Sequence, residues 1–120
     1  MTKSVIDLAA AHLKRQFLYQ TQRGRFGSVE AMRELAISAR GCVASSLSPA
    51  AATVAFVLET VLDKCARAPD GRPLRISEVA DLNDRLQGPV SRAVAFLTGA
   101  DDDPVDVAAA LIRAPSSRER

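Results

Sequence analysis

Three polar side chains in the second half of the chain, Gln87, Ser91 and Arg92, have the chemistry to contact a nucleic acid. An arginine guanidinium can donate two hydrogen bonds to one guanine, and glutamine and serine can bond to base edges or phosphates. If a helix begins near Pro89, Ser91 and Arg92 lie in its first turn and Gln87 lies just before it. The spacing therefore predicts that the three side chains face outward at the N-terminal end of a helix.

The elements that would position these side chains lie in the segment 76–97, which reads ISEVADLNDRLQGPVSRAVAFL. Ser77 is a suitable N-cap for a helix that runs to about Leu86. Gly88-Pro89 is expected to break that helix and to start a second one, which ends at Thr98. Ala80 is small enough to let the two helices cross closely. The second helix would carry apolar residues on its inner face, namely Val90 with Val94 or Ala93.

This pair of helices resembles the helix-turn-helix of bacterial transcriptional regulators, especially the MarR-like winged regulators, over residues 74–97. Leu74-Arg75-Ile76 is similar to the short strand that precedes the motif in winged proteins. The resemblance implies a DNA-binding regulator whose second helix enters the major groove. It also implies phosphate contacts from basic side chains elsewhere in the chain. The DNA-binding set predicted in this way is Gln87, Ser91, Arg92, Arg72, Arg75, Arg23 and Arg25.

The charge distribution supports a second interpretation. The chain has 16 Lys and Arg against 14 Asp and Glu, but residues 1–40 hold seven basic and three acidic side chains, whereas residues 77–112 hold two and seven. An acidic surface repels the phosphate backbone. The alternative function is therefore a protein-interaction module, such as an adaptor or anti-activator, that binds a basic partner through its acidic C-terminal half. The pair of helices would then be ordinary bundle helices joined at Gly88-Pro89.

A basic loop before the second expected helix is another candidate nucleic-acid site. Tyr19, Arg23, Arg25 and Phe26 combine stacking rings with guanidinium groups, and the N-terminus of the following helix favours anions. Such a loop could hold a phosphate or a single strand. The alternative is a solvated loop whose Phe26 anchors it to the core.

The residue types give little support for catalysis. His12 is the single histidine, so a zinc site built from several histidines is excluded, and the chain has no P-loop or dinucleotide fingerprint. The run Asp101-Asp102-Asp103 lacks the alternating ligands and the glycine of an EF-hand loop. These carboxylates are better explained as acidic residues at the start of the next helix. We therefore predict no enzyme, no cofactor and no metal site.

Apolar residues recur with helical periodicity along the whole chain, which predicts an all-α fold: a compact bundle of five or six short helices. One domain is expected over residues 1–113, with a flexible tail over 114–120. The third helix should form the centre of the bundle, because its first half is almost wholly apolar. The expected helices span about 5–20, 29–40, 49–67, 77–86, 89–98 and 104–113.

Cellular context follows from what the chain lacks. No signal peptide opens it, and the most apolar run, Pro49 to Leu58, is too short to span a membrane. A cytoplasmic location is therefore expected, with Cys42 and Cys65 as reduced, buried, small apolar residues. The apolar helical surface and the opposite charges of the two halves also predict a homodimer.

Overall fold

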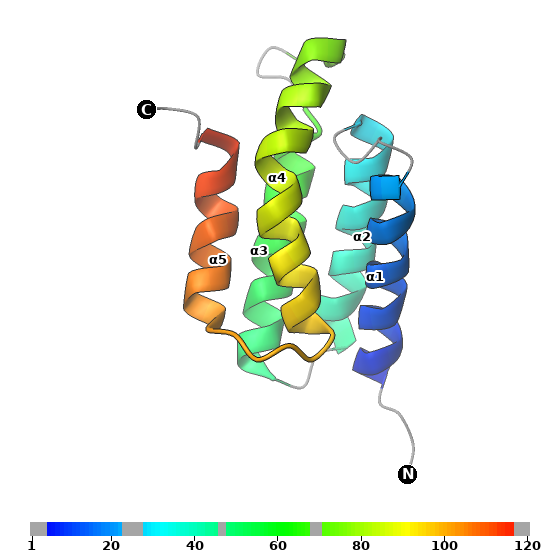
Figure 1. Cartoon of the computed structure of the whole chain (residues 1–120). Coiled ribbons are helices and arrows are strands. Elements are labelled where there is room, and N and C mark those ends of the chain that lie inside the picture. The colour runs from blue at the N-terminus through cyan, green and yellow to red at the C-terminus, as the bar shows by residue number, and fades with distance from the viewer. Residues whose placement is uncertain (1–4, 23–27, 46–47, 68–70, 117–120) are drawn as a thin grey trace.

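Helices make up the regular structure of the protein. The computed structural model describes residues 5–22, 28–45, 48–67 and 71–116, and this part of the chain contains no strand. The all-α bundle predicted from the sequence is confirmed (Figure 1). Its elements are α1 (Val5–Gln22), α2 (Val29–Ser45), α3 (Pro49–Cys65), α4 (Ile76–Leu97), α5 (Pro104–Arg113) and a 3-10 turn (Ala114–Ser116).

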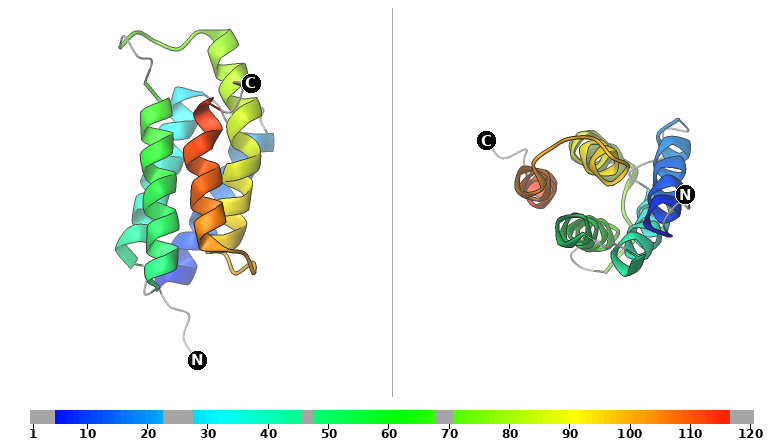
Figure 2. Two further views of the ribbon diagram at one scale, coloured as in Figure 1. Left: turned by 90° about the vertical axis from the view of Figure 1, so that its left-hand side faces the viewer. Right: turned by 90° about the horizontal axis from the view of Figure 1, so that it is seen from below.

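Successive helices run in opposite directions (Figure 1). Helices α1 to α4 form a four-helix arrangement in which each helix contacts two neighbours, and α5 packs against α3 and α4. Seen along the bundle, α5 lies on the side away from α1 and α2 (Figure 2). The 3-10 turn follows α5 and packs against α4, and its Ala114 is buried. This turn occupies residues 114–116 of the tail that was predicted over 114–120, and residues 117–120 lie outside the described residues.

The core consists of leucine, valine and alanine with few larger side chains. Leucine and valine side chains at helical spacing are completely buried, and Phe17 is the buried aromatic residue among those described. Small and aliphatic side chains let helices approach closely, which suits a bundle without tryptophan. The fully buried large side chains include Leu13, Met32, Leu35, Leu58, Leu62, Leu86, Val90, Val107 and Leu111.

Two helices begin at the capping signals that the sequence contains. The Ser48 hydroxyl accepts a hydrogen bond from the Ala51 N–H at 3.3 Å, and Pro49 occupies the first turn of α3. Asp103 accepts from the Val105 N–H at 3.0 Å at the start of α5, which Pro104 opens. A capped proline start satisfies orphan donors and pre-sets the helical φ angle. Both predicted starts are confirmed.

Helix α2 continues past residue 40, where the sequence predicted its end. Gly41 does not adopt the left-handed conformation of a C-cap, and α2 runs on to Ser45. Cys42 is 1% exposed, so the extra turn places another apolar side chain in the core. Tertiary packing therefore outweighs the local stop signal. Neither Cys42 nor the partly buried Cys65 forms a disulfide, and burial raises the pKa of both thiols.

Helix α4 is a single helix of 22 residues, so the predicted helix-turn-helix pair was wrong. The helix runs through Gly88 and Pro89 without a turn, and it begins after Arg75 instead of Ser77. Gly88 lacks the Cβ atom that clashes with a following proline ring in the helical conformation. The buried side chains continue on one face on both sides of Pro89: Leu82, Leu86, Val90, Ala93 and Val94.

Replacing Pro89 tests this continuity. Within a helix, proline removes the hydrogen bond to the carbonyl four residues earlier, here that of Arg85, and an interior proline costs up to about 3 kcal/mol relative to alanine. We expect Pro89→Ala to raise the free energy of unfolding by about 1–3 kcal/mol in urea denaturation. Pro104→Ala, in the first turn of α5, is the control and should give no such gain. A neutral or destabilising Pro89→Ala would indicate a turn at this position.

Candidate functional site

The central feature of the candidate site is an ion pair between Arg92 of α4 and Asp102 of the segment before α5. The Arg92 guanidinium donates two hydrogen bonds to the Asp102 carboxylate, from Nε and Nη2, each 2.8 Å long. The Asp103 N–H donates to the same carboxylate at 2.8 Å. This paired geometry is the strongest that an arginine forms with a carboxylate. Arg92 therefore ties the last turns of α4 to the segment that leads into α5.

Further carboxylates surround this pair. Asp101, Asp103 and Asp106 are exposed, and Asp103 and Asp106 are close enough to raise the pKa of Arg92 further. The hydrogen bonds from Arg92 and from the Asp103 N–H lower the pKa of Asp102 to about 2. Because Asp102, Asp103 and Asp106 all act on this one guanidinium and the exposed Asp101 precedes them in the sequence, this end of the bundle is acidic. We call Asp101, Asp102, Asp103 and Asp106 the acidic end.

Gln87 and Ser91, which were predicted with Arg92 to contact the DNA major groove, lie in different surroundings. Gln87 is partly buried and accepts a hydrogen bond from the Asn83 side chain at 3.5 Å. Ser91 is exposed and lines a hollow of about 340 Å³ between α1 and α4, together with Lys14 and Phe17. The three residues thus share one helix, but Arg92 faces the acidic end and Ser91 faces α1.

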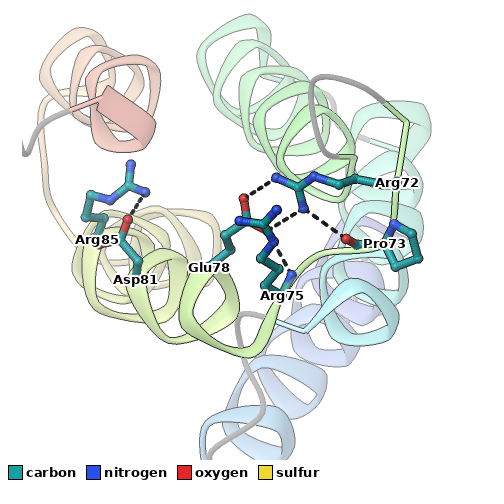
Figure 3. Close-up of polar contacts among 6 residues, drawn as sticks. All are labelled: Arg72, Pro73, Arg75, Glu78, Asp81 and Arg85. Atoms are coloured by element: carbon teal, nitrogen blue, oxygen red, sulfur yellow. Dashed lines mark hydrogen bonds and ion pairs between the residues drawn. The ribbon is translucent and has the colours of Figure 1, made fainter.

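Arg72 and Arg75 lie at the other end of α4 (Figure 3). Arg72 donates two hydrogen bonds of 2.8 Å to Glu78 and one of 3.1 Å to the Pro73 carbonyl. Glu78 also accepts the Arg75 N–H at 2.8 Å, as a glutamate in the first turn of a helix often does. These contacts lower the pKa of Glu78 to about 2. Arg72 therefore helps to start α4.

The predicted DNA-binding set is not gathered on one surface. A helix rises about 1.5 Å per residue, so Arg92 lies roughly 24 Å along α4 from Ile76, the residue after Arg75. Arg72 instead lines a cleft of about 880 Å³ with Arg33 and Arg67, between the start of α2, the end of α3 and the segment before α4. Arg23 and Arg25 lie outside the described residues, as does Phe26.

An apolar stripe on the outer face of α5 was missed by the sequence analysis. Val105 is 72% exposed and Ile112 is 62% exposed, whereas Val107 and Leu111 of the same helix are completely buried. Residues seven apart lie on the same face of a helix, so Val105 and Ile112 form one stripe beside Asp106. The sequence did contain a signal for this exposed stripe, because α5 has more apolar residues than are needed to cover the face that packs on the core.

The acidic end does not form a metal site among the described residues. No group of three or more His, Cys, Asp and Glu side chains among them is arranged to hold a metal ion. Asp102 bonds to Arg92 and Asp103 caps α5, so two of the three consecutive aspartates have structural roles. His12 is exposed on α1 and lines a hollow between α1 and α2. The helices of the described part of the chain are also too short or too polar to cross a membrane.

Comparison with known proteins gives no match to a protein-family model, to a curated protein or to a solved structure. The arrangement of charged and apolar side chains on this chain is therefore the basis for its functional interpretation.

The two carboxylates with lowered pKa predict acid sensitivity. Glu78 and Asp102 titrate near pH 2 in the folded protein, against ordinary values of 4.5 and 3.8. Their contribution to stability is thus present above those ordinary values and is lost as the pH falls towards 2. We expect Asp102→Asn to lower the midpoint of thermal unfolding at pH 6 and to flatten its decline between pH 5 and pH 2.

Asp84→Asn is the matched control for this measurement. Asp84 is exposed on α4 and forms no ion pair with another described residue, so its replacement should leave the pH dependence unchanged. If Asp102→Asn followed the same pH curve as the original protein, the pairing of Arg92 with Asp102 would not contribute to stability.

Proposed function

We propose that this protein is a protein-interaction module that binds a basic surface of a partner through its acidic end. The observation that carries the proposal is the pairing of Arg92 with Asp102, beside the carboxylates of Asp103 and Asp106 that also act on Arg92. The pair occupies the guanidinium that would otherwise offer positive charge at this end. The remaining exposed carboxylates are then available to a cationic partner.

The surroundings of these carboxylates have the composition of a docking surface. Val105 is exposed next to Asp106 and close in sequence to Asp101 and Asp103, so an apolar contact is bordered by negative charge. Interfaces commonly combine an apolar centre with a polar rim. Charges on the rim speed the encounter with an oppositely charged partner and reject partners of like charge. Association at the acidic end should therefore weaken as the ionic strength rises.

DNA binding, the other function predicted from the sequence, remains a prediction with less support. It was based on a two-helix unit, and α4 is one helix. A single helix can still enter a major groove. However, Arg92 would have to leave Asp102, and the neighbouring carboxylates would approach the phosphates. The same experiment can distinguish the two functions.

The proposed function is tested by affinity purification of the tagged protein from its native cells after nuclease treatment of the lysate. We expect a protein partner to remain bound. Asp106→Lys should weaken that complex by about tenfold or more, because it places a like charge against the basic partner. Asp84→Lys makes the same change of charge on an exposed position of α4 outside the acidic end, and it should leave the complex intact.

Two outcomes would contradict the proposal. One is that every bound component disappears with the nuclease and that the protein shifts duplex DNA in a gel. The other is that Asp106→Lys and Asp84→Lys retain the partner equally well. Circular dichroism of both variants establishes that the bundle is still folded.

A further inference from the structure

The outer face of α5 carries a charged row next to its apolar stripe. Asp106 and Arg113 are seven residues apart, as Val105 and Ile112 are, so each pair lies on one line along the helix. All four side chains are exposed. The apolar stripe and the charged row therefore run side by side, with a negative charge near the N-terminus of α5 and a positive charge at its C-terminus.

The two charges of this row are not paired within the described part of the chain. Neither Asp106 nor Arg113 forms an ion pair with another described residue. The two residues lie about 10 Å apart along the helix. Arg92 is near enough for the charge of Asp106 to act on it, but it donates its hydrogen bonds to Asp102. Both ends of the charged row are thus available to a group outside the chain.

Helix α5 lies at the edge of the bundle, and no other described helix covers its outer face (Figure 2). It packs on α3 and α4 through its opposite face, which contains Val107 and Leu111. Ala109 lies between the apolar stripe and the charged row, halfway from Val105 to Arg113. Because alanine is small, a second helix can approach closely at the middle of the outer face.

The outer face is complementary to a copy of itself that runs in the opposite direction. When two α5 helices lie antiparallel about Ala109, Val105 lies opposite Ile112 of the second copy. In the same arrangement, Asp106 lies opposite Arg113 of the second copy, and the twofold symmetry forms this ion pair twice. We propose that two copies of the chain associate through an antiparallel pair of α5 helices.

The charges favour this orientation over a parallel one. A parallel pair would bring like charges together at both ends of the charged row. Asp101 and Asp103 lie at the N-terminal end of α5, so the antiparallel pair places them towards the positive end, with Arg113, of the other copy. On α4, Arg85 and Arg92 are each bonded to an aspartate. The row is therefore the main unpaired charge on the outer face among the described residues.

The size of the face determines the strength of the contact. A helix of ten residues is about 15 Å long, which gives a smaller contact than a typical stable dimer has, so the association should be reversible. The dimer covers Val105 and Asp106, which also belong to the surface proposed for the basic partner. A dimer and a complex with that partner therefore exclude each other. This consequence rests on the proposed function, whereas the dimer itself does not.

Charge reversal at the two ends of the row tests the arrangement by sedimentation equilibrium. Asp106→Arg and Arg113→Asp should each weaken the dimer of the original protein by about tenfold or more, because each brings like charges together. An equimolar mixture of the two variants should restore a dimer of twice the chain mass of 12.8 kDa, since opposite charges then meet at both ends. The variant with both substitutions should dimerise with itself.

Asp84→Arg is the matched control. It makes the same change of charge as Asp106→Arg at an exposed position of α4, outside the outer face of α5, and it should dimerise like the original protein. Asp106→Lys and Arg113→Glu provide a second pair if either member of the first pair fails to fold. Circular dichroism of each variant establishes that it is folded.

Three outcomes would overturn the inference: an original protein that is monomeric at all concentrations, single variants that dimerise as well as the original, and a mixture that stays monomeric. The proposed function is tested separately, because Arg113→Asp retains Asp106 and should still capture the nuclease-resistant partner. Capture of that partner without a dimer would leave the proposed function standing. A dimer that obeys the charge reversals without any captured partner would leave this inference standing.

Discussion

The continuous apolar face of α4 is the constraint on which the rest of the structure depends. Leu82, Leu86, Val90, Ala93 and Val94 are buried along this face, on both sides of Pro89. A turn at Gly88 would rotate one half of the segment relative to the other and expose part of this surface. Burying an aliphatic side chain contributes about 1.5–3 kcal/mol, so several such side chains together outweigh the roughly 3 kcal/mol cost of an interior proline.

The direction of α4 in turn determines the surroundings of its polar side chains. Because the helix is continuous, Arg92 reaches the segment that leads into α5, where Asp102 accepts two of its hydrogen bonds. At the opposite end, Arg72 and the Arg75 N–H are bonded to Glu78. Residues that suggested DNA contact from their types thus form structural contacts within the bundle. The acidic end remains as an exposed charged surface.

Much of the fold could be predicted from local signals. Apolar residues at helical spacing identified the helices, and Ser48-Pro49 and Asp103-Pro104 marked two of their starts, because a cap followed by proline acts through neighbouring backbone atoms. The C-terminal end of α2 and the continuity of α4 could not be predicted in this way. Gly41 and Gly88-Pro89 are local stop signals, whereas the burial that overrides them depends on the other helices.

The candidate site was harder to predict for a related reason. Arg92 and Asp102 are ten residues apart, and their pairing depends on the path of the segment between α4 and α5. Valine and isoleucine are residue types typical of a core, so the sequence does not mark Val105 and Ile112 as exposed. Only the packing of α5 shows that the buried face of this helix is the one with Val107 and Leu111. The charge asymmetry along the chain did indicate an acidic C-terminal half, and the alternative function followed from it.

Amide hydrogen exchange across the middle of α4 tests the account most directly. In one continuous helix, the N–H groups of Val90, Ser91 and Arg92 donate to carbonyl oxygens four residues earlier. In a helix that started at Pro89, the N–H groups of Val90 and Ser91 would lack intrahelical acceptors, whereas that of Arg92 would still donate to the Gly88 carbonyl. We predict that the Val90 and Ser91 amides exchange slowly, like those in the middle of α3. Exchange as fast as that of the amides in the segment between α4 and α5 would contradict the single helix and the placement of Arg92 that depends on it.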